Sequence, residues 1–170
     1  MRHIGLITTL LAALLTGALL ACGGGGGGGG GSPPRNVVDI EPAGMVSGAL
    51  TTGDEVLAED GTRLDFYRVT LPQAGQFTAR LESTDFDAYL FLFEGAALDH
   101  AVLDEWEPYF LADDDDSGGG TDAEITIPLP AGTYVVVVNS FFPAFGDYTL
   151  ITAFLAFSPS ATEPLQLMSR

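Results

Sequence analysis

The sequence contains no lysine and a single cysteine, and both shortages limit what the chain can do. All six cationic residues are arginine, against 23 aspartate and glutamate residues, so the formal net charge is -17. A chain this acidic repels phosphate backbones, which excludes nucleic acid as a partner. Because one cysteine cannot form an intramolecular disulfide, any folded domain must depend on its own apolar core.

Histidine is nearly as scarce, since the sequence holds only His3 and His100. A zinc site or a histidine-based triad has little to build on, whereas abundant carboxylates favour a hard cation such as calcium or magnesium. Paired carboxylates carry no specific signal in a chain with 23 acidic residues. We therefore expect a protein that is not an enzyme.

The N-terminal segment has the layout of an export signal. Arg2 and His3 precede an uncharged apolar run over residues 4–21. The run ends in Leu19-Leu20-Ala21-Cys22, which resembles the lipobox of bacterial lipoproteins. This resemblance implies that residues 1–21 are removed, that Cys22 is acylated, and that the membrane is met through the lipid anchor only. In a Gram-negative host it implies the outer membrane, and an uncleaved anchor helix is the alternative.

A flexible tether follows the cysteine. Nine consecutive glycines over residues 23–31 and then Ser32-Pro33-Pro34 cannot bury apolar surface, so we expect residues 22–41 to be disordered. Nine such residues span about 15–18 Å as a random coil. After removal of residues 1–21 the chain keeps five cations against 23 acids, and 5 − 23 gives a formal charge of -18.

The remainder of the chain is patterned as short strands. From Gly44 onward, apolar and polar residues alternate in short runs that Gly, Pro, Asp and Ser clusters separate. This pattern predicts an all-β sandwich over residues 42–156, followed by a tail over residues 157–170. The expected strands cover residues 67–71, 77–82, 88–93, 125–129, 134–138 and 148–155.

Two of these strands are apolar on both faces, which distinguishes them from the others. Residues 88–93 and 134–138 contain almost no polar side chain, so we expect central strands whose outer face is partly covered by loops. Residues 96–107 are compatible with a short helix that Pro108 stops.

Six segments in sequence resemble one bacterial domain family, the pre-peptidase C-terminal domain, over about residues 44–154. The segments that carry the resemblance are Val46–Leu50, Asp65–Val69, Asp85–Leu90, Ala112–Gly120, Pro130–Tyr134 and Gly146–Leu150. The resemblance implies a jelly-roll-like antiparallel β-sandwich of about eight strands. It also implies a non-catalytic accessory domain, related to collagen-binding domains that hold calcium.

The most acidic segment of the chain is a candidate calcium site. Asp113, Asp115, Ser117 and Glu124 have the spacing of positions 1, 3, 5 and 12 of an EF-hand loop, with Gly118 at position 6. Since a strand, and not a helix, is expected after Glu124, the hypothesis is a calcium-binding turn on a β scaffold. The alternative is a solvated acidic loop without a metal.

Aromatic residues gather in two expected loops. Phe141, Phe142 and Phe145 form one group, and Trp106 lies in the other. Exposed rings of this kind favour a surface lipoprotein that binds an extracellular protein or polysaccharide. If the rings are instead buried at the ends of the sandwich, a structural or secretion-related module without a specific ligand is favoured.

Overall fold

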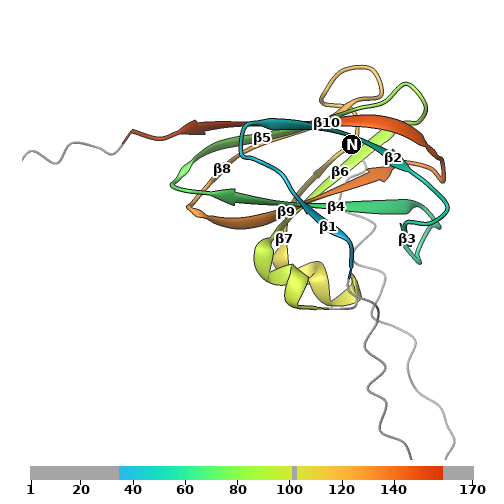
Figure 1. Cartoon of the computed structure of the whole chain (residues 1–170), viewed down its shortest axis with the longest axis horizontal. Helices are drawn as coiled ribbons and strands as arrows, with labels where there is room; N and C mark the ends of the chain where they lie inside the picture. The colour runs from blue at the N-terminus through green and yellow to red at the C-terminus, as the bar shows by residue number, and fades with distance from the viewer. Residues whose placement is uncertain (1–34, 101–102, 159–170) are drawn as a thin grey trace, which may run out of the picture. The chain divides into compact units, whose positions relative to one another are not determined.

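The computed structural model describes residues 35–100 and 103–158, which form two β-sheets packed face to face (Figure 1). Within these residues there are ten strands and two 3₁₀ helices. The first sheet has the order β1-β4-β9-β6-β7, with β3 paired to β4, and the second has the order β2-β10-β5-β8. All strand pairs are antiparallel except β1 with β4, which are parallel.

The bounds of the elements follow the sheets. The first sheet contains β1 (Val37–Asp39), β3 (Glu55–Val56), β4 (Arg63–Leu71), β6 (Ala88–Glu94), β7 (Phe110–Asp114) and β9 (Gly132–Ser140). The second sheet contains β2 (Gly44–Leu50), β5 (Gly75–Glu82), β8 (Ala123–Leu129) and β10 (Gly146–Ala156). The helices are η1 (Gly95–Asp99) and η2 (Leu103–Tyr109).

The main core lies between the two sheets and follows from the alternation of apolar residues. In β5, Phe77, Ala79 and Leu81 are fully buried while the residues between them face outward. Leu90 of β6 and Val136 of β9 meet them from the other sheet. The predicted all-β sandwich is confirmed, and each of the six expected strands is present.

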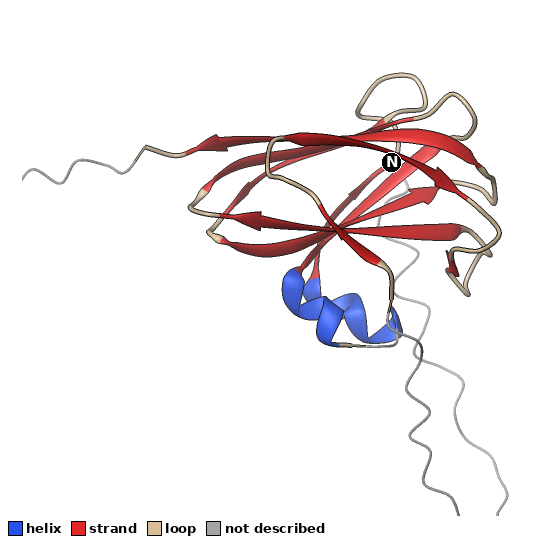
Figure 2. Cartoon of the chain, in the orientation of Figure 1, coloured by secondary structure: helices blue, strands red, loops and turns tan. Residues whose placement is uncertain are grey.

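A second, smaller core explains why β6 and β9 are apolar on both faces. The helices η1 and η2 lie over the outer face of the first sheet (Figure 2). Trp106 of η2 and Ala97 of η1 pack there against Phe66, Val135 and Val137. The expected cover over the central strands is therefore present, and it consists of two helical turns instead of extended loops.

The domain begins earlier than expected. Val37–Asp39 forms β1 and pairs with β4, although residues 22–41 were predicted to be a disordered tether. Arg35 is also fixed to the domain, because its guanidinium makes two hydrogen bonds to Glu55, at 2.6 and 2.7 Å. The signal peptide, Cys22 and the glycine run lie outside the described residues. In the described part of the chain, no helix is long and apolar enough to cross a membrane.

A buried polar network joins the two sheets. The hydroxyls of Tyr67 in β4 and Tyr148 in β10 lie 2.7 Å apart, and Tyr148 donates a hydrogen bond of 2.5 Å to Asp65. Gly48 of β2 makes this possible, since a Cβ atom there would lie 2.4 Å from the Tyr148 ring. The network ties β4 to β10 across the core.

Candidate functional site

Three phenylalanine rings are exposed on the turn between β9 and β10, which we call the Phe loop (residues 141–145). The exposed fractions of the side chains are 43% for Phe141, 65% for Phe142 and 51% for Phe145. The Phe141 and Phe142 ring centroids lie 4.7 Å apart, and Phe141 lies 5.9 Å from Tyr89 of β6. The expected exposure of these three rings is confirmed.

The ends of the Phe loop are held by hydrogen bonds to the neighbouring turn. The Phe141 amide donates to the Asp87 carbonyl oxygen at 2.9 Å, and the Asp147 amide donates to the Asp85 carboxylate at 2.8 Å. Gly146 has a φ of 145° and lies so close to Asp85 that a Cβ atom would sit 2.3 Å from the Asp85 Cβ. The aspartates at this turn thus position the loop, as their interpretation as turn residues requires.

A cation lies at one side of the Phe loop. The Arg63 guanidinium is 5.9 Å from the Phe145 ring centroid, within the range of a cation–π contact. Arg63 also donates to the Asp54 carbonyl oxygen at 3.0 Å. This contact holds Phe145 beside β4, and the local sequence around the loop gave no indication of it.

The second aromatic candidate, Trp106, was wrongly expected at the surface. Its side chain is 1% exposed, and its ring lies 5.7 Å from Phe66 and 5.2 Å from Phe93. The Arg35 guanidinium covers it at 4.7 Å from the ring centroid. Trp106 is a core residue because the outer face of the first sheet is apolar and must be covered, so the burial alternative holds there.

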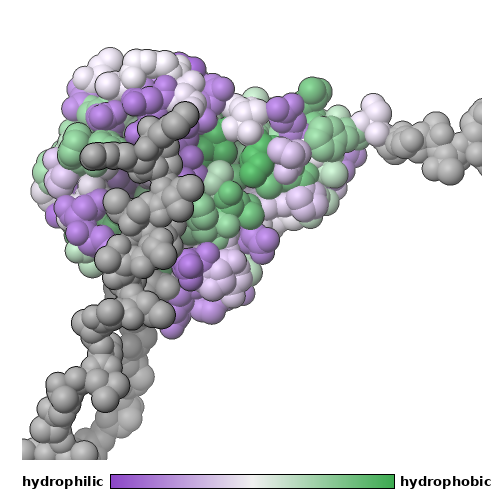
Figure 3. Space-filling model, turned by 180° about the vertical axis from the view of Figure 1, so that it is seen from behind, coloured by the Kyte–Doolittle hydropathy of each residue, from purple (hydrophilic) through white to green (hydrophobic). Residues whose placement is uncertain are grey.

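The Phe loop is one of several apolar areas at the surface. Seen from behind, apolar surface also adjoins the point where the chain leaves β10 (Figure 3). Leu155 and Phe157 near that point, and Met45 of β2, have side chains that are 69%, 50% and 71% exposed. In the described residues, however, only the Phe loop places three exposed rings within five positions, next to further aromatic rings.

The proposed calcium loop does not have the conformation that its spacing suggested. Asp113 lies in strand β7, paired opposite Phe91, and its carboxylate accepts a hydrogen bond from the Tyr89 hydroxyl. The carboxylate that organises the turn is instead that of Asp114. It accepts the backbone amides of Ser117 at 3.0 Å and of Glu124 at 2.8 Å.

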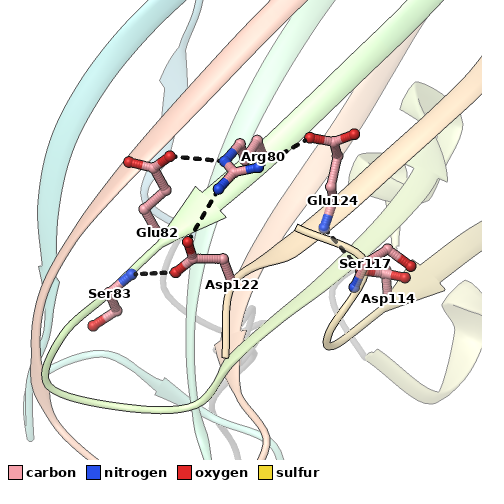
Figure 4. Close-up of polar contacts among 7 residues, drawn as sticks. All are labelled: Arg80, Glu82, Ser83, Asp114, Ser117, Asp122 and Glu124. Carbon is pink, nitrogen blue, oxygen red and sulfur yellow. Dashed lines mark hydrogen bonds and ion pairs between the residues drawn. The ribbon is translucent and has the colours of Figure 1, made fainter. Parts of the chain in front are cut away.

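Glu124 faces an arginine and not the acidic turn (Figure 4). Arg80 of β5 pairs with Glu82 at 2.7 Å, Asp122 at 3.1 Å and Glu124 at 3.4 Å. Within residues 35–100 and 103–158, no group of three or more His, Cys, Asp or Glu side chains is placed to hold a metal ion. Asp113, Asp115, Ser117 and Glu124 therefore do not fit a calcium ion in this arrangement.

Calcium binding stays a prediction of the sequence, and calorimetry of the purified chain in constant high sodium chloride tests it. The geometry predicts equal melting temperatures with and without calcium, in the parent and in Asp115→Ala. Constant salt is needed because any cation screens the repulsion in a chain this acidic. A rise of several degrees in the parent alone would instead support the spacing hypothesis.

His100, the histidine of the described part of the chain, is engaged on both ring nitrogens. Its Nδ1 lies 3.2 Å from a Glu105 carboxylate oxygen, and its Nε2 lies 2.8 Å from the Tyr109 hydroxyl. Its carbonyl oxygen accepts a hydrogen bond from the Trp106 indole at 3.1 Å. These contacts give His100 a structural role at the helical cover.

The fold and the exposed loop define a β-sandwich domain with an aromatic end. No family model matches the sequence, and no curated protein matches it. Among solved structures, the chain is similar to the pre-peptidase C-terminal domain of a collagenase from Bacillus anthracis. The two share 14% sequence identity with a TM-score of 0.51, over 71% of this chain and 98% of that one.

A surface-associated copper-binding protein of Methylomicrobium album BG8, CorA, is also similar. It shares 8% identity with a TM-score of 0.50, over 72% of this chain and 99% of that one. At these identities the likeness establishes the fold. The expected resemblance to a pre-peptidase C-terminal domain is confirmed at that level.

Proposed function

We propose that this chain is a non-catalytic binding module of the cell envelope, which holds an extracellular protein through the Phe loop. The observation that carries the proposal is the exposure of Phe141, Phe142 and Phe145. Exposed rings cost solvation free energy in the free protein, and contact with a partner recovers it. A structural module without a ligand gives no reason for three adjacent exposed rings.

The setting of the loop favours a protein over a polysaccharide. The planes of Phe141 and Phe142 are inclined by 88°, and those of Tyr89 and Phe141 by 42°. Sugar rings stack on flat aromatic faces, whereas rings inclined in this way form notches that apolar side chains fill. We therefore take a protein as the partner and a polysaccharide as the alternative outcome.

Export and lipidation complete the proposal. The Leu-Leu-Ala-Cys ending of the apolar run supports removal of the signal and acylation of Cys22. Two proteins that share the fold also fit this setting, since one is a domain of a collagenase and the other is described as surface-associated. We place the chain on the envelope, lipid-anchored to the outer membrane in a Gram-negative host.

The test compares a loop variant with a matched surface variant. The triple variant Phe141→Ser, Phe142→Ser and Phe145→Ser should lose an extracellular or envelope protein that the parent retains, with affinity reduced by about tenfold or more. The control variant, Met45→Ser with Leu155→Ser, removes exposed apolar side chains from the other sheet and should retain the same partner. Binding is measured by titration of the purified chains, after circular dichroism shows equal melting temperatures.

Two results would contradict the proposal. Equal affinity of the parent and the triple variant would remove the Phe loop as the binding surface. If the retained material resists protease and is released by glycan hydrolysis, the partner is a polysaccharide. The first result leaves the structural-module alternative, and the second changes the class of ligand.

A further inference from the structure

The exposed rings of the Phe loop continue as a row of rings along the outer face of β6. We define the aromatic row as Phe142, Phe141, Tyr89, Phe91 and Phe93. Successive ring centroids lie 4.7, 5.9, 4.8 and 6.2 Å apart. The three β6 residues occupy alternate positions and are half-buried, so they present ring surface on one side of the sheet.

Carboxylates line the aromatic row on the side of β7. Asp113 pairs opposite Phe91 and accepts the Tyr89 hydroxyl proton in a hydrogen bond. Burial raises the pKa of Tyr89, and the hydrogen bond and the negative charges of Asp113 and Asp115 raise it further. Among the described residues, no arginine or histidine forms an ion pair with Asp113 or Asp115. This side of the row is therefore strongly negative without an internal counter-charge.

The same molecule shows how such a surface holds a cation. The Arg35 guanidinium lies 4.7 Å from the centroids of both Phe66 and Trp106, and pairs with Glu55 through two nitrogens. The Trp106 ring in turn contacts Phe93 at the end of the aromatic row. One end of this ring system thus already contains an arginine between aromatic faces and a carboxylate.

We propose that the aromatic row binds an arginine-bearing segment of the extracellular partner, an inference that rests on the proposed function. The guanidinium lies against Tyr89 and Phe91 and pairs with Asp113 and Asp115, while neighbouring apolar side chains of the segment contact the Phe loop. Arginine is favoured over lysine because its planar group stacks on a ring and also bonds a carboxylate through two nitrogens.

The test uses synthetic peptides and a pair of isoelectric variants. The probe is the peptide Leu-Arg-Phe-Arg-Leu, and its comparison peptides carry citrulline, lysine or glutamate at both arginine positions. Citrulline keeps the shape of arginine without its charge. The variant Asp113→Asn with Asp115→Asn removes two charges beside the row, and Glu41→Gln with Glu59→Gln removes two exposed charges elsewhere.

The arginine peptide should bind the parent and the Glu41/Glu59 control equally, and the Asp113/Asp115 variant with Kd raised by about tenfold. The lysine peptide should bind more weakly than the arginine peptide, and the citrulline and glutamate peptides should not bind measurably. Equal binding of the citrulline and arginine peptides, or equal loss in both variants, would overturn the inference.

The outcome separates this inference from the proposed function. The Asp113/Asp115 variant keeps all the phenylalanines of the row, and the triple phenylalanine variant keeps all the carboxylates. If the protein partner is lost only by the phenylalanine variant, the proposed function stands and the arginine-bearing segment is overturned. If the partner binds both variants as it binds the parent, the proposed function itself fails.

Discussion

Replacing Trp106 by alanine is expected to lower the free energy of unfolding by about 3–5 kcal/mol, the cost of emptying a large aromatic site in a core. Trp106 is the largest fully buried side chain of the described part of the chain, and it fills the space between η2 and the first sheet. The change also removes its hydrogen bond to His100 and one of the two rings that hold Arg35. Urea unfolding followed by far-ultraviolet circular dichroism measures the loss.

The control is Leu155→Ala, since that side chain is 69% exposed and its loss should change the unfolding free energy by less than about 0.5 kcal/mol. A cost below about 1 kcal/mol for Trp106→Ala would mean that the helical cover contributes little. The small core outside the first sheet would then be a surface layer, and not a part of the cooperative fold.

The position of this small core was partly readable from the sequence. The doubly apolar strands β6 and β9 required a cover on their outer face, and residues 96–107 offered a helical segment close to them in the chain. What the sequence could not provide is the part that Arg35 plays. Arg35 lies 71 positions before Trp106, and only the packing of β1 beside β4 brings the two together.

The calcium hypothesis shows why spacing alone misleads in a β protein. Glu124 pairs opposite Arg80 because of the register between β5 and β8, and a shift of one residue would turn its side chain to the other face. Such register depends on contacts between distant segments. The run of aspartates also concealed β7, whose Asp113 and Asp114 point to opposite faces of a strand that was expected to be a loop.

The two aromatic groups were equivalent in local sequence but differ in the structure. Trp106 is covered because an apolar sheet face lies beneath it, whereas Phe141 and Phe142 follow the last pairing of β9 with β6, at Ser140. The alternation of Tyr89, Phe91 and Phe93 was visible in the sequence. Its continuation into the Phe loop was not, because it depends on the pairing that brings Ala88 opposite Ser140.

Replacing Tyr148 by phenylalanine is expected to lower the free energy of unfolding by about 1–3 kcal/mol near neutral pH, because it leaves buried partners without a hydrogen bond. The hydroxyl of Tyr148 connects Tyr67 and Asp65 in the core. Burial raises the pKa of Asp65 in the folded protein, and the Tyr148 hydroxyl opposes this rise by stabilising the ionised carboxylate. Without the hydroxyl, the folded-state pKa of Asp65 moves further above its unfolded value.

The sign of the pH dependence follows from this change. A carboxyl group whose pKa is raised by folding loses stabilisation as the pH rises from its unfolded pKa, about 3.9, through its folded pKa. The destabilisation caused by Tyr148→Phe should therefore be larger at pH 7 than at pH 3, where Asp65 is protonated in both states. Urea titrations of the parent and the variant across this range measure the difference.

Two further variants isolate Asp65 as the cause. In Tyr134→Phe the lost hydroxyl donates only to the Pro130 carbonyl oxygen, at 2.9 Å, so its cost should vary much less with pH. Placing Tyr148→Phe in an Asp65→Asn background should leave the cost of the lost hydroxyl but remove its pH dependence, since the amide does not titrate. If the cost of Tyr148→Phe is the same at pH 3 and pH 7, Asp65 is not ionised in the folded protein at neutral pH, and the tyrosine stabilises the core as a neutral hydrogen-bond donor alone.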